Sequence, residues 1–347
     1  MNKINLFFPV LLALAAAAGS VCAGENRASS GSLDLPAHGY GLSIGNSANF
    51  NGLRINFRDK NVERINGINL TIWGSDQNKT AVVNGLSLSL LHEAGELNGI
   101  SLGALGMGAE REMRGVNVGV VGIGAGESLA GLNFGGIGLG AGENVSGVNL
   151  GGIGVGAGGN LKGINFGGIG AGAGGDVRWI TVGGLGAGAG RDMLGLNIGG
   201  LGVGAGRDLT GISLALLGAG AGRNMSGINL AGIGVLSGNA LRGISFGGIG
   251  AGAPRVQGLA IGGVGAGGVY LDGVILAAAF VTVADDGRLR GFSASAFNQI
   301  KGTQSGVALG IVNYARRLNG VQIGVINYVR DNPKFLKVLP VLNVHLD

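Results

Sequence analysis

The chain has 347 residues, of which 78 are glycine and only 12% are charged, and its formal net charge at pH 7 is +5. This much glycine without a three-residue period or abundant proline excludes collagen, and a hydrophobic content of 46% argues against a disordered polar tract. The single cysteine excludes a disulfide framework and a metal site built from several cysteines.

Residues 1–23 have the features of a signal peptide. Lys3 supplies a positive charge, residues 6–18 form a short apolar core, and the tripeptide Val21-Cys22-Ala23 has the small-x-small pattern of a cleavage site. The apolar core is too short for a membrane-spanning helix. We therefore expect an exported protein, located in the periplasm, in the outer membrane or at the cell surface. Two fates remain open for Cys22, which either carries a lipid or is removed with the signal peptide.

Residues 24–48 are interpreted as an N-terminal leader or cap, and residues 49–114 as irregular coils of a repeat. The leading glycines of these coils, Gly52, Gly67, Gly85 and Gly99, are 15, 18 and 14 residues apart. Unequal spacing predicts loops of different length, and His92 is expected in one of these loops.

Residues 115–272 contain a regular sixteen-residue repeat, as in the copy GLNFGGIGLGAGENVS. When positions are numbered from the leading glycine, apolar residues occupy positions 2, 4, 7, 9, 11 and 15. Alternation predicts one short strand through positions 2 and 4 and a second through positions 7, 9 and 11, all facing one interior. Glycines at positions 5 and 6 predict a bend, and Gly, Asp and Asn at positions 12 to 14 predict a polar turn. A helix is rejected because each glycine would cost about 1 kcal/mol relative to alanine.

Position 3 is polar in each copy up to the one that begins at Gly243, and it is expected to point outward, between the two inward residues. Stacked side-chain amides can then hydrogen bond from coil to coil and form a surface ladder. Two interpretations of this ladder stay open: a regular polar array that binds a glycan, a mineral or ice, and a self-satisfying row that keeps the face soluble. The asparagines of the predicted ladder are Asn117, Asn133, Asn149, Asn165, Asn197 and Asn229.

Residues 273–347 are interpreted as irregular C-terminal coils and a cap, because Pro333 and Pro340 would stop strand pairing. Within this part, the segment SAFNQIKGTQSGVALGIVNYARRLNGVQIGVINYVRDNP resembles uncharacterised exported bacterial proteins built from Gly-Leu-x-Ile-Gly-Leu-x-Asn repeats. The similarity covers residues 48–347. It implies a surface or envelope repeat protein and carries over no catalytic residue.

Stacking of these units predicts an all-β protein, a single elongated β-solenoid with coils of about sixteen residues. The alternative is an up-and-down transmembrane β-barrel in which each unit is one strand and a tight turn. A barrel strand needs about ten residues with one uninterrupted apolar face. The glycine pair breaks that face in every copy, so the solenoid is favoured.

No residue is predicted to be catalytic, and no metal or other cofactor is expected. His38, His92 and His345 are far apart in a linear repeat, so they cannot form a triad or a metal cage. Glu110 and Glu112, like the pair Asp285-Asp286, have the pattern of solvated turns. The cations are scattered, without the dense basic stripe that nucleic-acid binding requires.

These observations predict a non-enzymatic exported scaffold at the bacterial cell envelope, with a structural or adhesive role. Its partner is expected to be an envelope polymer, a glycan or another surface protein, and not a nucleic acid. Membrane association and the oligomeric state remain open. An outer-membrane β-barrel, porin-like or structural, is the alternative function.

Overall fold

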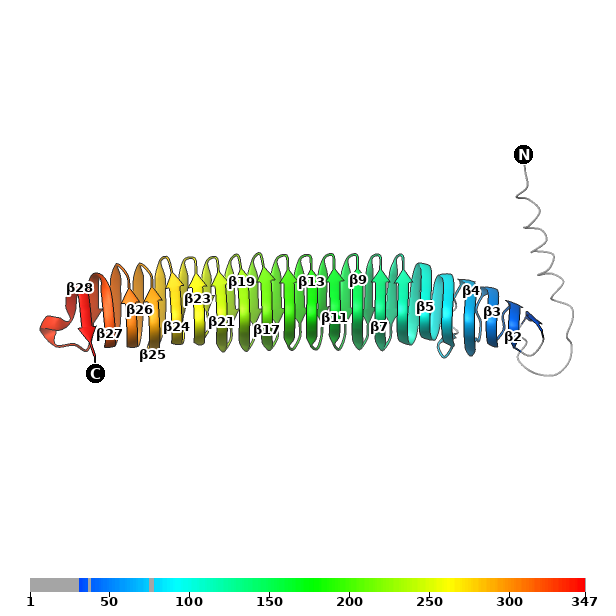
Figure 1. Cartoon of the computed structure of the whole chain (residues 1–347), viewed down its shortest axis with the longest axis horizontal. Coiled ribbons are helices and arrows are strands. Elements are labelled where there is room, and N and C mark those ends of the chain that lie inside the picture. Colours follow the sequence, from blue (N-terminus) through cyan, green and yellow to red (C-terminus); the bar gives the residue numbers. More distant parts are fainter. Residues whose placement is uncertain (1–30, 37–38, 75–77, 347) are drawn as a thin grey trace, which may run out of the picture. The chain divides into compact units, whose positions relative to one another are not determined.

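The computed structural model describes residues 31–36, 39–74 and 78–346. The predicted signal peptide, including Cys22, lies outside these residues, as does His38. The chain divides into two compact units, unit 1 (Met1–Gly158) and unit 2 (Gly159–Asp347). Both units consist of stacked β-coils, and within each unit every coil lies beside the next (Figure 1).

Unit 1 contains the more irregular coils and the first regular ones. Its strands are β1 (Ser32–Leu35), β2 (Tyr40–Gly45), β3 (Asn49–Arg58), β4 (Arg64–Trp73), β5 (Val82–Gly119), β6 (Gly122–Ala125), β7 (Ser128–Gly135), β8 (Gly138–Ala141), β9 (Asn144–Gly151) and β10 (Gly154–Ala157).

Unit 2 continues with alternating long and short strands and ends in longer ones. Its elements are β11 (Leu161–Gly167), β12 (Gly170–Ala173), β13 (Val177–Gly183), β14 (Gly186–Ala189), β15 (Met193–Gly199), β16 (Gly202–Ala205), β17 (Asp208–Ala215), β18 (Gly218–Ala221), β19 (Asn224–Ala231), β20 (Gly234–Ser237), β21 (Ala240–Gly247), β22 (Gly250–Gly252), β23 (Arg255–Gly262), β24 (Gly265–Ala277), β25 (Phe280–Ala294), β26 (Phe297–Leu309), β27 (Val312–Val329), the 3₁₀-helix η2 (Lys334–Leu336) and β28 (Val338–His345).

Parallel pairing one coil apart defines the fold. In unit 2, β15 pairs with β17 so that Gly195 lies opposite Gly211, and β16 pairs with β18 so that Gly202 lies opposite Gly218. The offset equals the sequence repeat, so the predicted β-solenoid with coils of about 16 residues is confirmed. The alternative of an up-and-down barrel is wrong, because its sequential neighbours would pair antiparallel.

One coil of unit 2 shows how the repeat folds. Strand β15 ends at position 5, the chain bends at Gly200 and Leu201, strand β16 covers positions 8 to 11, and the chain turns again at Gly206 and Arg207. The glycine bend and the polar turn are therefore confirmed.

The predicted direction of the first strand is wrong. In the same coil, Leu196 and Ile198 at positions 2 and 4 point outward, whereas Asn197 at position 3 is buried. In unit 2 the buried side chains are small at positions 9 and 11, as with Val203 and Ala205, whereas position 15 carries larger ones such as Leu209. The interior is filled by these residues, and the glycine at position 5 faces it as well. The large side chains of positions 2 and 4 lie outside. Leu201 at position 7, which was predicted to face the interior together with positions 9 and 11, is exposed as well, so that prediction is also wrong.

Antiparallel strands close the outer ends of both units. In unit 1, β1 pairs antiparallel with β2, within the segment predicted to be a leader or cap. In unit 2, the chain passes through η2 after Pro333, and β28 pairs antiparallel with β27. Pro340 lies in β28, opposite the irregularity in the register between Gly324 and Asn327, where a missing amide donor is tolerated. The last parallel coil is thereby covered by a strand that runs in the opposite direction.

Candidate functional site

An exposed apolar face is the most extensive chemical feature of unit 2. It consists of three rows, formed by positions 2, 4 and 7 of seven consecutive coils. The first row is Ile164, Ile180, Leu196, Ile212, Ile228, Ile244 and Leu259; the second is Phe166, Val182, Ile198, Leu214, Leu230, Phe246 and Ile261; the third is Ile169, Leu185, Leu201, Leu217, Ile233, Ile249 and Val264.

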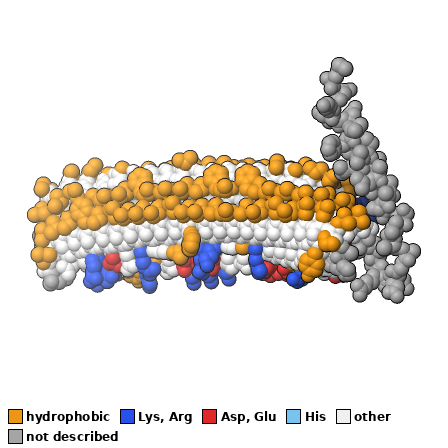
Figure 2. All heavy atoms as spheres, turned by 45° about the vertical axis from the view of Figure 1, so that its right-hand side comes forward, with side chains coloured by type: hydrophobic (Ala, Val, Ile, Leu, Met, Phe, Trp, Pro, Cys, Tyr) orange, Lys and Arg blue, Asp and Glu red, His pale blue; other side chains and the backbone are white. Residues whose placement is uncertain are grey.

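These side chains are accessible to solvent although every one of them is aliphatic or phenylalanine. Five residues of the first row, three of the second and all seven of the third are exposed, and the others are half-buried. Figure 2 shows the hydrophobic side chains in parallel rows on one side of the coils, with the charged side chains along another edge. Monomeric proteins rarely expose contiguous apolar patches of more than a few hundred Å².

Glycines hollow the apolar face between the second and third rows. Positions 5 and 6 are glycine or alanine in six of the seven coils, and in the three coils that begin at Gly195, Gly211 and Gly227 they line a groove of about 380 Å³ beside the second row. In the remaining coil, position 6 is Leu216, which lines this groove and is 70% exposed. The groove can therefore receive a row of side chains from outside, and Leu216 projects from it.

A second hollow lies on the other side of the third row, over the glycines of positions 8 and 10. It has a volume of about 370 Å³, and Ile233, Ile249 and Leu236 are among its lining residues. Apolar atoms dominate its walls, so it extends the apolar face.

Charged side chains gather at the polar turns, where they pair with one another. Arg207 Nη2 lies 2.6 Å from Asp192 Oδ2 of the preceding coil, and Arg223 Nη2 lies 2.6 Å from Asp208 Oδ2. The hydrogen bond from Arg207 lowers the pKa of Asp192 below its ordinary value. Burial raises the pKa of Asp208, but the hydrogen bonds from Arg223 and Asn224 outweigh it, so that this pKa is lowered as well. These two pairs are therefore locally neutral, whereas residues 159–258 as a whole contain seven Lys or Arg and only three Asp.

The six asparagines of the predicted surface ladder are present as stacked columns, but they lie inside the coils. Asn117, Asn133, Asn149, Asn165, Asn197 and Asn229 are only 0–2% exposed. In unit 1, Asn117 Nδ2 donates to Asn133 Oδ1 at 2.9 Å, and Asn133 Nδ2 donates to Asn149 Oδ1 at 2.8 Å. The expectation of an outward ladder that contacts a glycan, a mineral or ice is corrected. In unit 1 these amides hydrogen bond to one another, as buried polar groups require. In unit 2, Asn197 Oδ1 and both amide atoms of Asn229 are buried without a hydrogen-bond partner among the described residues.

A second, partly buried amide ladder runs along unit 1 at the residue before each leading glycine. Asn66 Nδ2 donates to Asn51 Oδ1 at 2.7 Å, Asn84 Nδ2 donates to Asn66 Oδ1 at 2.7 Å, and Asn98 Nδ2 donates to Asn84 Oδ1 at 3.0 Å. This ladder was not predicted from the sequence, although the recurring Asn-Gly dipeptide could have indicated it.

The column of position 3 also contains a buried charge in unit 1. Arg54 is fully buried, and its Nη1 lies 2.6 Å from Asp59 Oδ1 and 2.9 Å from Asn69 Oδ1. His92 is buried nearby in β5, 3.4 Å from Ser87 Oγ, and not in an exposed loop as predicted. Burial lowers the pKa of His92 to about 4, since the nearby Asp59 opposes this only partly. His92 is therefore neutral at pH 7.

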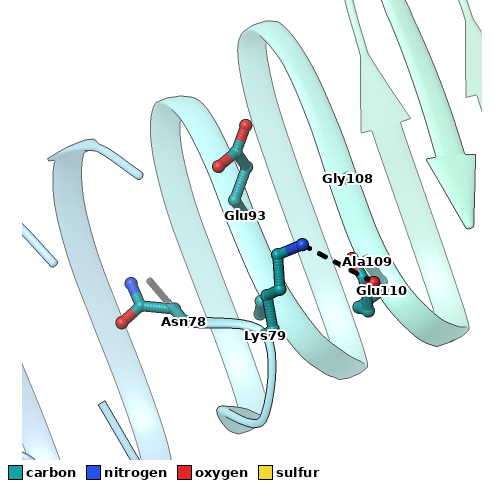
Figure 3. Close-up of a pocket in the computed structure, with 7 residues that line it drawn as sticks. Asn78, Lys79, Glu93, Gly108, Ala109 and Glu110 are labelled. Carbon is teal, nitrogen blue, oxygen red and sulfur yellow. Dashed lines mark ion pairs between the residues drawn. The ribbon is translucent and has the colours of Figure 1, made fainter. Parts of the chain in front are cut away.

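A pocket of about 260 Å³ in unit 1 brings Lys79 near two carboxylates (Figure 3). Lys79 Nζ lies 3.9 Å from Glu110 Oε1, and both side chains are exposed, so solvent screens the pair. Glu93 lies on the neighbouring coil with its carboxylate directed away from Glu110. This arrangement does not converge on a reacting atom. Within the described ranges, no three His, Cys, Asp or Glu side chains gather closely enough to hold a metal ion.

Comparisons with known proteins identify no relative of this chain. No family model, no curated protein and no solved structure matches the chain. The resemblance to exported surface repeat proteins therefore stays a prediction. In the part of the chain that the structure describes, no helix is long and apolar enough to cross a membrane.

Proposed function

We propose that the protein is a non-catalytic scaffold, exported to the bacterial cell envelope, that acts through the apolar face of its solenoid. The observation that carries this proposal is the repetition of the same three apolar rows in seven consecutive coils of unit 2. A surface that repeats with the coil suits an extended contact, because each coil adds the same small contribution. A catalytic site would instead need a few convergent polar groups in a closed pocket.

Export rests on the pattern of residues 1–23, and a structural or adhesive role rests on the face. Of the contacts predicted from the sequence, another surface protein fits the face better than a glycan or a charged polymer. Glycans need polar and aromatic partners, and the amide ladder that could have supplied polar groups is buried. Asp192 and Asp208 pair with Arg207 and Arg223, so only part of the positive charge at the turns is available to a charged polymer.

Cell fractionation tests the proposal. The full chain is expressed in a bacterium with two membranes, beside a variant that lacks residues 2–23. We expect the full chain in the envelope fraction, with a mature N-terminus at Gly24 by mass spectrometry, and the variant in the cytosol. Full-length chain that stays in the cytosol with residues 1–23 intact would contradict export.

A further inference from the structure

We propose that the apolar face of unit 2 binds the same face of a second copy of this chain. This inference rests on the proposed function in taking the apolar face as the working surface, and it names the partner. It does not depend on export, so the two proposals can fail separately.

The size of the face is that of a stable protein interface. Three rows over seven coils present 21 large apolar side chains, and a standard interface uses roughly 20–30 residues per partner, with homodimers at or above that size. The exposed row residues and the glycines of the groove also give the composition of an interface core, which is depleted in charged residues. Left uncovered, such a face would make the free chain prone to association.

Periodicity favours a second copy over an unrelated protein. Neighbouring strands lie about 4.8 Å apart, so the side chains of each row repeat at that spacing from coil to coil. Only a surface with the same repeat matches side chain to side chain over seven coils, and a second copy has this repeat by construction. Flat β-faces with identical spacing interdigitate into dry interfaces, as packed sheets do.

The groove and Leu216 supply complementary shapes. Six of the seven coils have glycine at position 6, and the seventh has Leu216, the most exposed residue of the face. In an antiparallel dimer offset by one coil, the Leu216 side chain of each copy can lie over Gly232 of the other, with six of the seven coils matched. Because a symmetric dimer interface contains each contact twice, the Leu216 side chains of both copies would be buried.

A lipid surface fits less well. Membrane-interface proteins place Trp and Tyr at the headgroup level and combine apolar insertion with Lys and Arg that attract anionic lipids. None of the 21 row positions is Trp, Tyr, Lys or Arg. The nearby turn arginines, Arg207 and Arg223, are already paired with aspartates.

Analytical ultracentrifugation of the mature chain, residues 24–347, tests the proposal with two matched variants. Leu201→Glu changes a third-row residue that is 46% exposed, and Leu194→Glu changes the last residue of the preceding coil, a leucine that is 47% exposed but lies outside the rows. We expect wild type and Leu194→Glu to be dimers at micromolar concentration. In a symmetric dimer, Leu201→Glu buries two carboxylates and should weaken dimerisation by at least about 100-fold, since unpaired interfacial charges cost several kcal/mol.

Leu216→Gly is a second variant that introduces no charge and restores the repeat consensus. It should keep the circular dichroism spectrum of wild type and also weaken dimerisation, because both copies lose a buried leucine. A monomeric wild type, or equal weakening by Leu194→Glu and Leu201→Glu, would overturn the proposal. So would monomeric wild type that floats with neutral phosphatidylcholine vesicles, which would assign the face to lipid. Exported but monomeric protein refutes only the dimer, whereas dimeric protein retained in the cytosol refutes only export.

Discussion

The leading glycine of each coil is the position at which a single methyl group should do the most damage. Gly211 has a φ of +113°, a backbone conformation that L-residues rarely adopt. A Cβ atom at Gly211 would lie 2.3 Å from the carbonyl oxygen of Gly195 in the neighbouring coil, and 3.0 Å from its carbonyl carbon. Both atoms belong to the backbone, so no side chain can move aside. Gly211→Ala must therefore push two paired coils apart.

Two contributions determine how much stability Gly211→Ala should lose. The backbone conformation alone costs an alanine about 1–3 kcal/mol, and separation of the coils adds to this, so we expect a loss of at least about 2 kcal/mol. Gly204→Ala is the matched control, because Gly204 has no positive φ and its nearest contact for a Cβ is Gly220 O at 4.0 Å. An alanine at a permissive strand position should be neutral or stabilise by roughly 0.5–1 kcal/mol.

Native-state hydrogen exchange of backbone amides is the suitable assay, since stacked repeats can open locally and need not unfold in one step. In Gly211→Ala, the amides of β15 and β17 should exchange faster, with opening free energies lower by the amount above, and the same amides in Gly204→Ala should be unchanged or better protected. Equal protection in the two variants would refute the reasoning. It would mean that leading glycines do not stack at the register described for β15 and β17.

Two further predictions concern unit 1. Asn133→Ala should lower the free energy of unfolding, measured by urea denaturation, by about 2–4 kcal/mol. The substitution removes the oxygen that accepts a hydrogen bond from Asn117 and the amide that donates one to Asn149. An unchanged urea midpoint would contradict a buried ladder. The pKa of His92 is about 4 in the folded chain and 6.5 when unperturbed, so the unfolded chain takes up a proton first as pH falls. The free energy of unfolding should therefore fall by on the order of 3 kcal/mol as the pH is lowered from 6.5 to 4. His92→Gln should lack this part of the pH dependence. Identical pH profiles of the two proteins would show that His92 is not buried in its neutral form.

The sequence predicted the coil but not which side of its first strand faces inward. Glycine pairs and polar turns act locally, so the bend at Gly200 and the turn at Gly206 could be located from residue types alone. The direction of the strand depends on the space available inside, which alternation does not report. The rule that apolar residues face inward assumes that the interior is the only dry environment a side chain can reach.

One signal in the repeat could have corrected this expectation. Position 5, which has the same parity as position 3, is always glycine or alanine in the regular coils, and position 11 is nearly always alanine. A narrow interior accepts the strand side that carries small residues, which here also carries Asn197 and its equivalents. Arg54 and His92 could not be placed in this way, because the spacing of the early coils is irregular and hides which residues share a column.

The buried amides and the exposed apolar rows are two consequences of one arrangement. Inside the coils, amides such as Asn133 are shielded from water, where hydrogen bonds between stacked neighbours are stronger. Residues at positions 9, 11 and 15 supply the internal apolar packing, so each coil stacks without the help of positions 2, 4 and 7. Folding and association thus draw on different side chains. Substitutions in the apolar rows, such as Leu201→Glu, are expected to change what the protein binds and leave its coils intact. Substitutions of Asn133 or Gly211 should instead destabilise the coils and leave the side chains of the apolar rows unchanged.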